Sequence, residues 1–128
     1  MRVLVDTHAI LWWLADDKRL SKAARRILED STHGRIVSFA SLWEIAIKMS
    51  AGKLLVRDLS FSELPPLLRS LEFQFLPIRL GDLERLDSLP WHHRDPFDRL
   101  LIAQSLEEGI PLMTSDDWVE DYRLRTIW

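Results

Sequence analysis

The stretch VLVDTHAILWWLA at residues 3–15 joins a short apolar run, an acid and a longer apolar segment. Residues 3–5 have the composition of a buried strand, and residues 9–15 have the spacing of a helix. Asp6 therefore falls at the junction where a strand ends and a helix is about to begin. This arrangement predicts the first strand–helix unit of an α/β fold.

The same alternation continues along the chain, without a repeat, a low-complexity tract or a linker. Further apolar runs with strand character lie at residues 35–37, 73–76, 111–113 and 125–127, and helix-period segments lie at residues 22–30, 42–49, 61–71, 81–86 and 97–108. Strands that alternate with helices form a parallel sheet with helices on both faces. The pattern therefore predicts a three-layer α/β/α fold.

Length and composition favour a single domain over residues 1–128. With 47% apolar residues, the chain is long enough for one hydrophobic core and too short for two. It has no cysteine, so disulfides and thiolate metal sites are excluded. The acid at position 6 comes too early for a signal peptide, and the longest apolar run, residues 9–15, cannot span a bilayer. We therefore expect a cytoplasmic protein without a membrane segment.

Four acidic residues occupy the same kind of position. They are Asp6, Glu44, Asp98 and Asp116, and each falls where a strand ends or a helix begins. The carboxyl ends of parallel strands share one edge of the sheet, so these remote carboxylates are expected to meet there. Clustered hard oxygen ligands suit Mg²⁺ or Mn²⁺, and such ions promote in-line attack on a phosphodiester. The set therefore indicates a metal-dependent nuclease.

Individual acids also have purely structural interpretations. Asp6 suits the N-cap of the helix that begins near His8. Glu44 fits a capping box with Ser41 and a favourable i,i+4 pair with Lys48. Four coincidences at equivalent positions are less plausible than one, so the set carries more weight than any member.

A second acid lies close to each of the last two candidates, Asp98 and Asp116. Asp95, which a proline follows, is the better helix cap, and Asp98 in the first turn is either a dipole-favoured acid or a ligand. Beside Asp116, both Thr114 and Asp117 suit a turn or a cap. Asp95 and Asp117 are therefore supporting candidates for the site.

Taken in order, these blocks resemble the PIN-domain family, and most of all the VapC-type toxin ribonucleases of toxin–antitoxin pairs. The resemblance rests on residues 3–8 (VLVDTH), 11–14 (LWWL), 41–45 (SLWEI), 95–104 (DPFDRLLIAQ) and 114–116 (TSD). It covers the chain essentially from end to end. A lone Asp-Thr-His would be weak, but these blocks in this order are specific.

The resemblance implies a sheet of four or five parallel strands and RNA hydrolysis at an acidic site that binds Mg²⁺ or Mn²⁺. By motif position, the family's acidic places fall on Asp6, Glu44, Asp98 and Asp116, and its hydroxyl place falls on Thr114. The Thr114 hydroxyl would support a carboxylate by a hydrogen bond. The resemblance also implies 5′-phosphate and 3′-hydroxyl product ends, a small antitoxin that blocks the cleft, and a homodimer.

Several neighbouring side chains have open roles. His92 and His93 are adjacent on an irregular segment and point in different directions, so a loop role is favoured over metal binding. Arg94, Arg99 and Lys48 flank the acids, either as salt-bridge partners or as phosphate contacts.

Partner surfaces are less well defined. The formal net charge of −3 argues weakly against broad electrostatic binding of nucleic acid. Divalent ions would neutralise the clustered acids, which leaves basic side chains elsewhere free to contact phosphate. The apolar residues 12–13 and 64–71 either contact a protein partner or fill the core.

Two other functions fit parts of the pattern. A phosphotransfer protein with an aspartate nucleophile would carry a second acid two residues after Asp6, where this chain has His8. A catalytically inactive PIN-like binding or scaffold module is the non-enzymatic alternative, and the intact set of four acids argues against it. Calorimetry of divalent-metal binding separates these possibilities.

Overall fold

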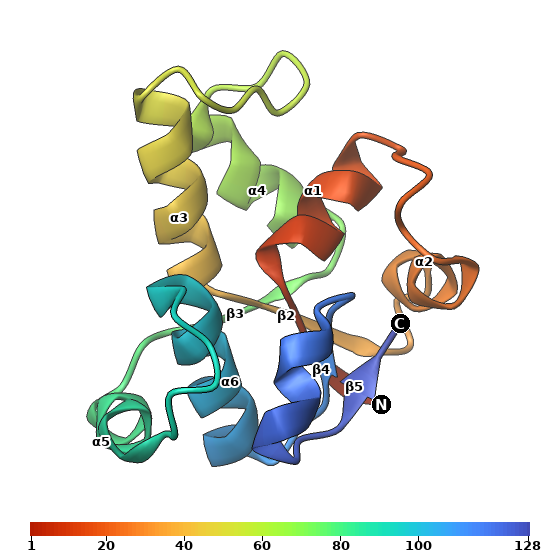
Figure 1. Cartoon of the computed structure of the whole chain (residues 1–128). Helices are drawn as coiled ribbons and strands as arrows, with labels where there is room; N and C mark the ends of the chain where they lie inside the picture. Colours follow the sequence, from red (N-terminus) through yellow and green to blue (C-terminus); the bar gives the residue numbers. More distant parts are fainter.

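Five parallel strands form a single sheet in the order β3-β2-β1-β4-β5 (Figure 1). The computed structural model describes all residues from 1 to 128. The strands are β1 (Arg2–Val5), β2 (Gly34–Ser38), β3 (Gln74–Leu76), β4 (Leu112–Met113) and β5 (Thr126–Ile127). The predicted parallel sheet is confirmed, including its last strand.

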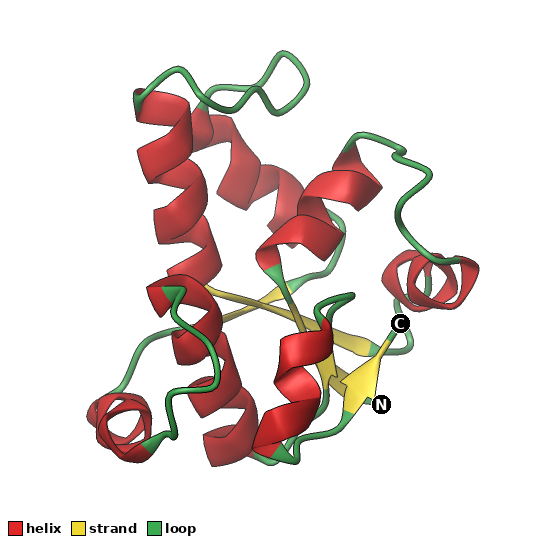
Figure 2. Ribbon diagram, viewed as in Figure 1, coloured by secondary structure: helices red, strands yellow, loops and turns green.

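Six α-helices connect and cover the strands, on both sides of the sheet (Figure 2). They are α1 (Thr7–Leu14), α2 (Lys22–Glu29), α3 (Phe39–Ser50), α4 (Leu64–Ser70), α5 (Leu80–Ser88) and α6 (Pro96–Glu108), and 3₁₀ helices lie at Phe61–Glu63 and Asp117–Tyr122. Val3 and Val5 pack in one hydrophobic cluster with α1, α2 and α4, whereas Leu4 packs in a second cluster with α6. The three predicted layers are therefore present. None of the helices combines the length and the apolar character needed to cross a membrane.

β1 lies in the middle of the sheet, between β2 and β4. The chain first extends the sheet on one side, through β2 and β3, and then returns to the other side for β4 and β5. The order reverses between β1 and β4, whose last residues Val5 and Met113 are paired. Open α/β sheets bind ligands at such a reversal, outside the carboxyl ends of the strands. The fold therefore predicts a binding site next to Asp6 and Thr114, the residues that follow these two strands.

The third helix begins earlier than its pattern predicted. α3 starts at Phe39, because the Ser38 hydroxyl accepts the backbone N–H of Ala40 at 2.9 Å and so caps the helix. Ser41 consequently lies inside the helix rather than at its start. The predicted capping box between Ser41 and Glu44 is wrong.

The helix predicted over residues 61–71 is divided. It begins as a 3₁₀ helix, Phe61–Glu63, and continues as α4. Pro65 and Pro66 occupy the first turn of α4 and have no backbone N–H to donate. A continuous α-helical hydrogen-bond ladder through this segment is therefore not possible.

A buried polar side chain holds α6 against the sheet. Gln104 has no solvent exposure, and its Oε1 accepts a hydrogen bond from Ser38 Oγ at the end of β2. Its Nε2 donates to the carbonyl oxygen of Pro77 and to Oδ2 of Asp82, both at 3.2 Å. A fully satisfied buried network of this kind specifies one packing arrangement. It fixes the position of α6, and with it that of Asp98 in the first turn.

Replacing Gln104 with leucine should lower the free energy of unfolding by about 2 to 4 kcal/mol, because Ser38 and Asp82 would each lose a partner while remaining buried. Urea denaturation of the parent and the variant measures this change. Gln74→Leu, the same substitution at an exposed position of β3, is the matched control and should change stability little. Equal stability of the parent and Gln104→Leu would contradict the anchoring role.

Candidate active site

Asp6 lies directly beyond β1 and is the N-cap of α1. Its Oδ1 accepts the backbone N–H of Ala9 at 2.8 Å, and the residue is only 7% exposed. Burial raises the pKa of Asp6, and a hydrogen bond with the Thr114 side chain opposes that rise. The cap occupies one carboxylate oxygen only. A structural role and a ligand role are therefore compatible in Asp6.

Thr114 and Asp116 follow β4 and line the same small cavity as Asp6. The Thr114 hydroxyl accepts the backbone N–H of Asp116 at 3.1 Å. Oδ1 of Asp116 accepts the backbone N–H of Trp118 at 3.0 Å, which caps the following 3₁₀ helix and leaves Oδ2 for other partners. Asp117, by contrast, is exposed and forms no hydrogen bond or ion pair with the cluster.

The start of α6 contributes Asp98. Asp95 caps this helix, since its Oδ1 accepts the backbone N–H groups of Phe97 at 2.9 Å and of Asp98 at 3.0 Å. Asp95 thus serves the backbone, while Asp98 lines the cavity. Burial raises the pKa of Asp98 to about 7, and the nearby charge of Asp95 adds to the rise. A bound cation would relieve this cost by favouring the ionised carboxylate.

His93 lies between two of the acids. Its Nε2 is 3.0 Å from Oδ2 of Asp116 and 3.3 Å from Oδ2 of Asp98. His92 is exposed and makes no contact with these carboxylates. Sequence reasoning favoured a loop role for both histidines and therefore missed His93. Its place two residues before the helix cap Asp95 was the signal that could have identified it.

Glu44 is buried in the second turn of α3 and does not contact the three aspartates. Its Oε2 accepts a hydrogen bond from Lys48 Nζ at 2.8 Å, so the predicted i,i+4 pair is present. Its Oε1 is buried without a partner, an arrangement that a cation would relieve. The Trp43 ring packs edge-on against Phe97, with centroids 5.1 Å apart, which places this turn of α3 beside the start of α6.

Arg99 is buried and contacts none of the acids of the site. It is 4% exposed, and its guanidinium donates to the backbone carbonyls of Leu86, Leu89 and Pro90 at distances between 2.9 and 3.5 Å. The same group lies 3.8 Å from the centre of the Trp91 ring. Both roles considered for Arg99 from sequence are therefore wrong. Its function is to fasten the loop that precedes α6.

The lining of the site has the donor chemistry that suits a small divalent cation. Asp6, Asp98, Thr114 and Asp116 line a cavity of about 10 Å³, which is about the volume of one water-sized sphere and excludes organic ligands. The donors are carboxylate and hydroxyl oxygens, the ligands that Mg²⁺ and Mn²⁺ prefer. Glu44, whose Oε1 is buried without a partner, is not among the residues that line this cavity.

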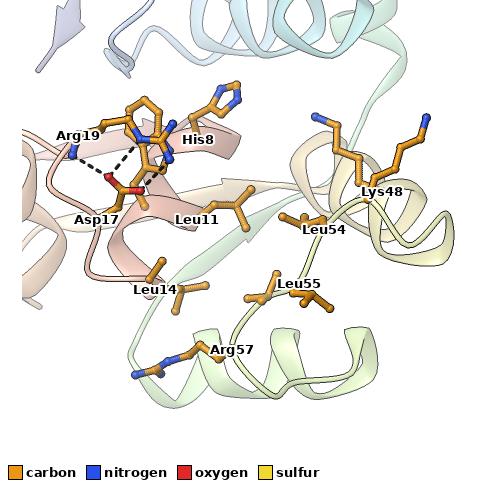
Figure 3. A pocket seen from close by; sticks show the side chains of 13 residues that line it. His8, Leu11, Leu14, Asp17, Arg19, Lys48, Leu54, Leu55 and Arg57 are labelled. Atoms are coloured by element: carbon orange, nitrogen blue, oxygen red, sulfur yellow. Dashed lines mark hydrogen bonds and ion pairs between the residues drawn. The ribbon is translucent and has the colours of Figure 1, made fainter.

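A larger groove lies between α1 and the segment that follows α3 (Figure 3). Its volume is about 420 Å³, and leucines from both elements line it, among them Leu11 and Leu54. His8 and four cationic side chains also line it: Arg19, Lys48, Lys53 and Arg57. His8 lines the groove and lies near Asp6, so the groove adjoins the acidic site at this residue.

The cations of the groove differ in how they are paired. Arg19 is bound to Asp17 at 2.7 Å, and Lys48 is bound to Glu44. Lys53 and Arg57 are exposed and form no ion pair. The groove therefore carries excess positive charge in a chain whose net charge is −3.

Comparison with known proteins gives one sequence match and several structural ones. A family model described as the PIN domain matches residues 3–123. No curated protein sequence matches the chain.

Several solved structures share its fold, among them the following three. VapBC2 from Rickettsia felis, bound to a DNA fragment from the promoter, has a TM-score of 0.76 and 14% identity over 100% of this chain and 99% of that chain. DNA-bound VapBC from Salmonella typhimurium has a TM-score of 0.71 and 12% identity over 99% and 97%. A toxin–antitoxin complex from Klebsiella pneumoniae has a TM-score of 0.58 and 17% identity over 89% and 86%.

Proposed function

This chain belongs to the PIN-domain family, and on that premise we propose that it is a divalent-metal-dependent ribonuclease and the toxin of a type II toxin–antitoxin pair. One observation carries the proposal. Asp6, Asp98 and Asp116 come from remote parts of the chain and converge on an ion-sized cavity at the point where the strand order reverses. Such a site suits phosphodiester hydrolysis.

The side chains of the site have different proposed roles in metal binding. Asp6, Asp98 and Asp116 would hold Mg²⁺ or Mn²⁺, and Glu44 would add a fourth carboxylate. A bound ion of this kind generates a nucleophile from water and offsets the charge that develops on the phosphate. Thr114 links Asp6 to the turn at Asp116, because its hydroxyl is hydrogen-bonded to both residues. No side-chain nucleophile is required.

The groove supports single-stranded RNA as the substrate. Its unpaired cations, Lys53 and Arg57, suit the phosphate backbone, and its apolar lining suits the faces of bases. Its connection to the acidic site through His8 would align a bound strand with the metal. The positive charge of the groove matters more for RNA binding than the negative net charge of the whole chain.

Reversing both free charges, with Lys53→Glu and Arg57→Glu, should weaken RNA binding most at low salt. For single strands, the loss of two phosphate contacts should make the slope of log affinity against log salt shallower by about 1.4. Binding is measured by fluorescence anisotropy, in an Asp6→Asn background that prevents cleavage. Lys22→Glu with Arg26→Glu, the same charge change on α2 outside the groove, is the control. Equal slopes for the two double variants would exclude the groove as the RNA path.

The structural neighbours support a cognate antitoxin as partner, since one of them is a toxin–antitoxin complex. α3 presents an apolar stripe in which Phe39, Trp43 and Ile47 are 43%, 56% and 43% exposed, one turn apart. Exposed apolar stripes of this kind mark protein contacts. The stripe suits the antitoxin or the second copy of a homodimer. Residues 12–13, and Leu64, Leu67 and Leu68 of the segment 64–71, instead pack in or against the core.

Metal-dependent cleavage separates the ribonuclease from the inactive scaffold module. Purified protein should cut a randomised single-stranded RNA pool in Mn²⁺ or Mg²⁺ and should stop when EDTA is added. A protein that binds no Mn²⁺ in calorimetry and leaves the whole pool intact is the scaffold module, and the proposed activity fails.

A further inference from the structure

We infer that His93 is a positioning residue that orients the carboxylates of Asp98 and Asp116 through its Nε2–H group, and is not itself a metal ligand. The inference rests on the proposed function, since it assigns a role within the proposed metal site. Its geometric basis is the pair of contacts from Nε2 to the two Oδ2 atoms, at 3.0 and 3.3 Å.

Three contacts hold His93 in place. Its backbone N–H donates to the Tyr122 hydroxyl at 2.8 Å, and its Nδ1 accepts the backbone N–H of Asp95 at 3.0 Å. The ring also packs edge-on against Trp118, with centroids 6.3 Å apart. The side chain is only 15% exposed. His93 therefore presents Nε2 to the acids from a fixed direction.

The contact at Nδ1 decides the tautomer. A backbone N–H can only donate, so Nδ1 must offer its lone pair to Asp95, and the ring proton then resides on Nε2. Nε2–H is a donor, Oδ2 of Asp116 accepts its hydrogen bond at 3.0 Å, and Oδ2 of Asp98 lies 3.3 Å from the same nitrogen. A histidine that binds metal through Nε2 needs the opposite tautomer, with Nδ1–H donating to an acceptor. The proximity of one nitrogen and two carboxylates suggests a mixed-ligand site, but the hydrogen-bond directions exclude that arrangement.

Arg99 also supports the position of His93, although it does not contact His93 itself. Arg99 fastens the loop before α6, and it also lies 3.5 Å from the Tyr122 hydroxyl that receives the His93 backbone N–H. The loop that precedes α6, held by Arg99, thus places His93 beside the acids. Carboxylates that bind metal are themselves hydrogen-bonded, and the loss of such a partner weakens metal affinity by roughly 10- to 100-fold.

Substitutions that copy one ring nitrogen at a time provide the test. The side-chain amide of His93→Gln reaches the position of Nε2, whereas that of His93→Asn reaches only the position of Nδ1. Calorimetry with Mn²⁺ should show that His93→Gln keeps most of the affinity of the parent, while His93→Asn and His93→Ala lose roughly 10- to 100-fold. Pulsed EPR of Mn²⁺ in the parent should show no nitrogen coupling from an imidazole ligand.

A metal-free measurement keeps the inference separate from the proposed function. In EDTA, nitrogen NMR of the His93 ring should show the proton on Nε2. A proton on Nδ1 would overturn the inference, as would imidazole coupling to bound Mn²⁺ or unchanged affinity in His93→Ala. If the parent binds no Mn²⁺ at all, the proposed function fails, and the tautomer measurement still decides whether His93 is the donor.

Discussion

Asp6→Asn is expected to reduce RNA cleavage by about a thousandfold while the protein remains folded. The substitution removes a charged oxygen ligand, and a metal ion supplies several kcal/mol of transition-state stabilisation, where each 1.36 kcal/mol is a factor of ten in rate. The fold should survive because asparagine caps helices about as well as aspartate, so Ala9 keeps a partner for its backbone N–H. Single-turnover cleavage, together with a melting curve recorded in EDTA, measures both effects.

A matched control exists on the same edge of the sheet. Asp117→Asn removes the same charge from an exposed acid next to Asp116, and it should cut at nearly the parental rate. If Asp6→Asn retains parental activity on an RNA that the parent cuts, Asp6 is only a helix cap. If Asp117→Asn is as inactive as Asp6→Asn, the fourth acidic place has been assigned to the wrong residue.

Asp98→Asn should have opposite effects on stability without and with metal. In EDTA at about pH 8, the ionised Asp98 carboxylate is held in a partly buried place near Asp95, which costs free energy that a neutral amide avoids. The variant should therefore melt at or above the parental temperature. With excess Mn²⁺ the order should reverse, because the parent gains about 2.7 kcal/mol at a hundredfold excess over Kd and the variant gains less.

The pH dependence of metal-free stability follows from the same shift. The pKa of Asp98 is about 7 in the folded protein and 3.8 in the reference state. Between these values the folded state retains a proton that the unfolded state has released, so the contribution of Asp98 to stability is complete below pH 3.8 and falls as the pH rises toward 7. This decline should be absent from Asp98→Asn. Parallel pH profiles for the parent and Asp98→Asn in EDTA would show that Asp98 is not strained.

The strands and the convergence of two acids were predictable because both depend on local signals. A short apolar run predicts a buried strand, and parallel strands all end at the same edge of a sheet. Residues that come soon after β1 and β4, such as Asp6 and Asp116, therefore come close together in any fold that pairs those strands. The division between Asp95 as cap and Asp98 as inward acid also followed from the helix-start signal.

The other features depend on contacts between distant parts of the chain. His93 is held beside the acids by contacts that include Tyr122 and Trp118, which lie near the other end of the sequence. The role of Arg99 is defined by backbone carbonyls in a loop, and no side-chain pattern marks those groups. Glu44 stands apart from the aspartates in a helix whose start shifted to Phe39, because Ser38 rather than Ser41 caps it. Local periodicity cannot reveal any of these arrangements.

End-group analysis of RNA cut in water enriched in heavy oxygen is the most direct test of metal-dependent hydrolysis at the Asp6, Asp98 and Asp116 site. With Mn²⁺, the parent should produce 3′-hydroxyl ends and 5′-phosphate ends that contain one heavy oxygen, because water is the nucleophile. These products should be absent in EDTA and greatly reduced with Asp6→Asn. Ends that carry 2′,3′-cyclic phosphate, or labelled ends that form equally well in EDTA, would contradict metal-dependent hydrolysis at this site.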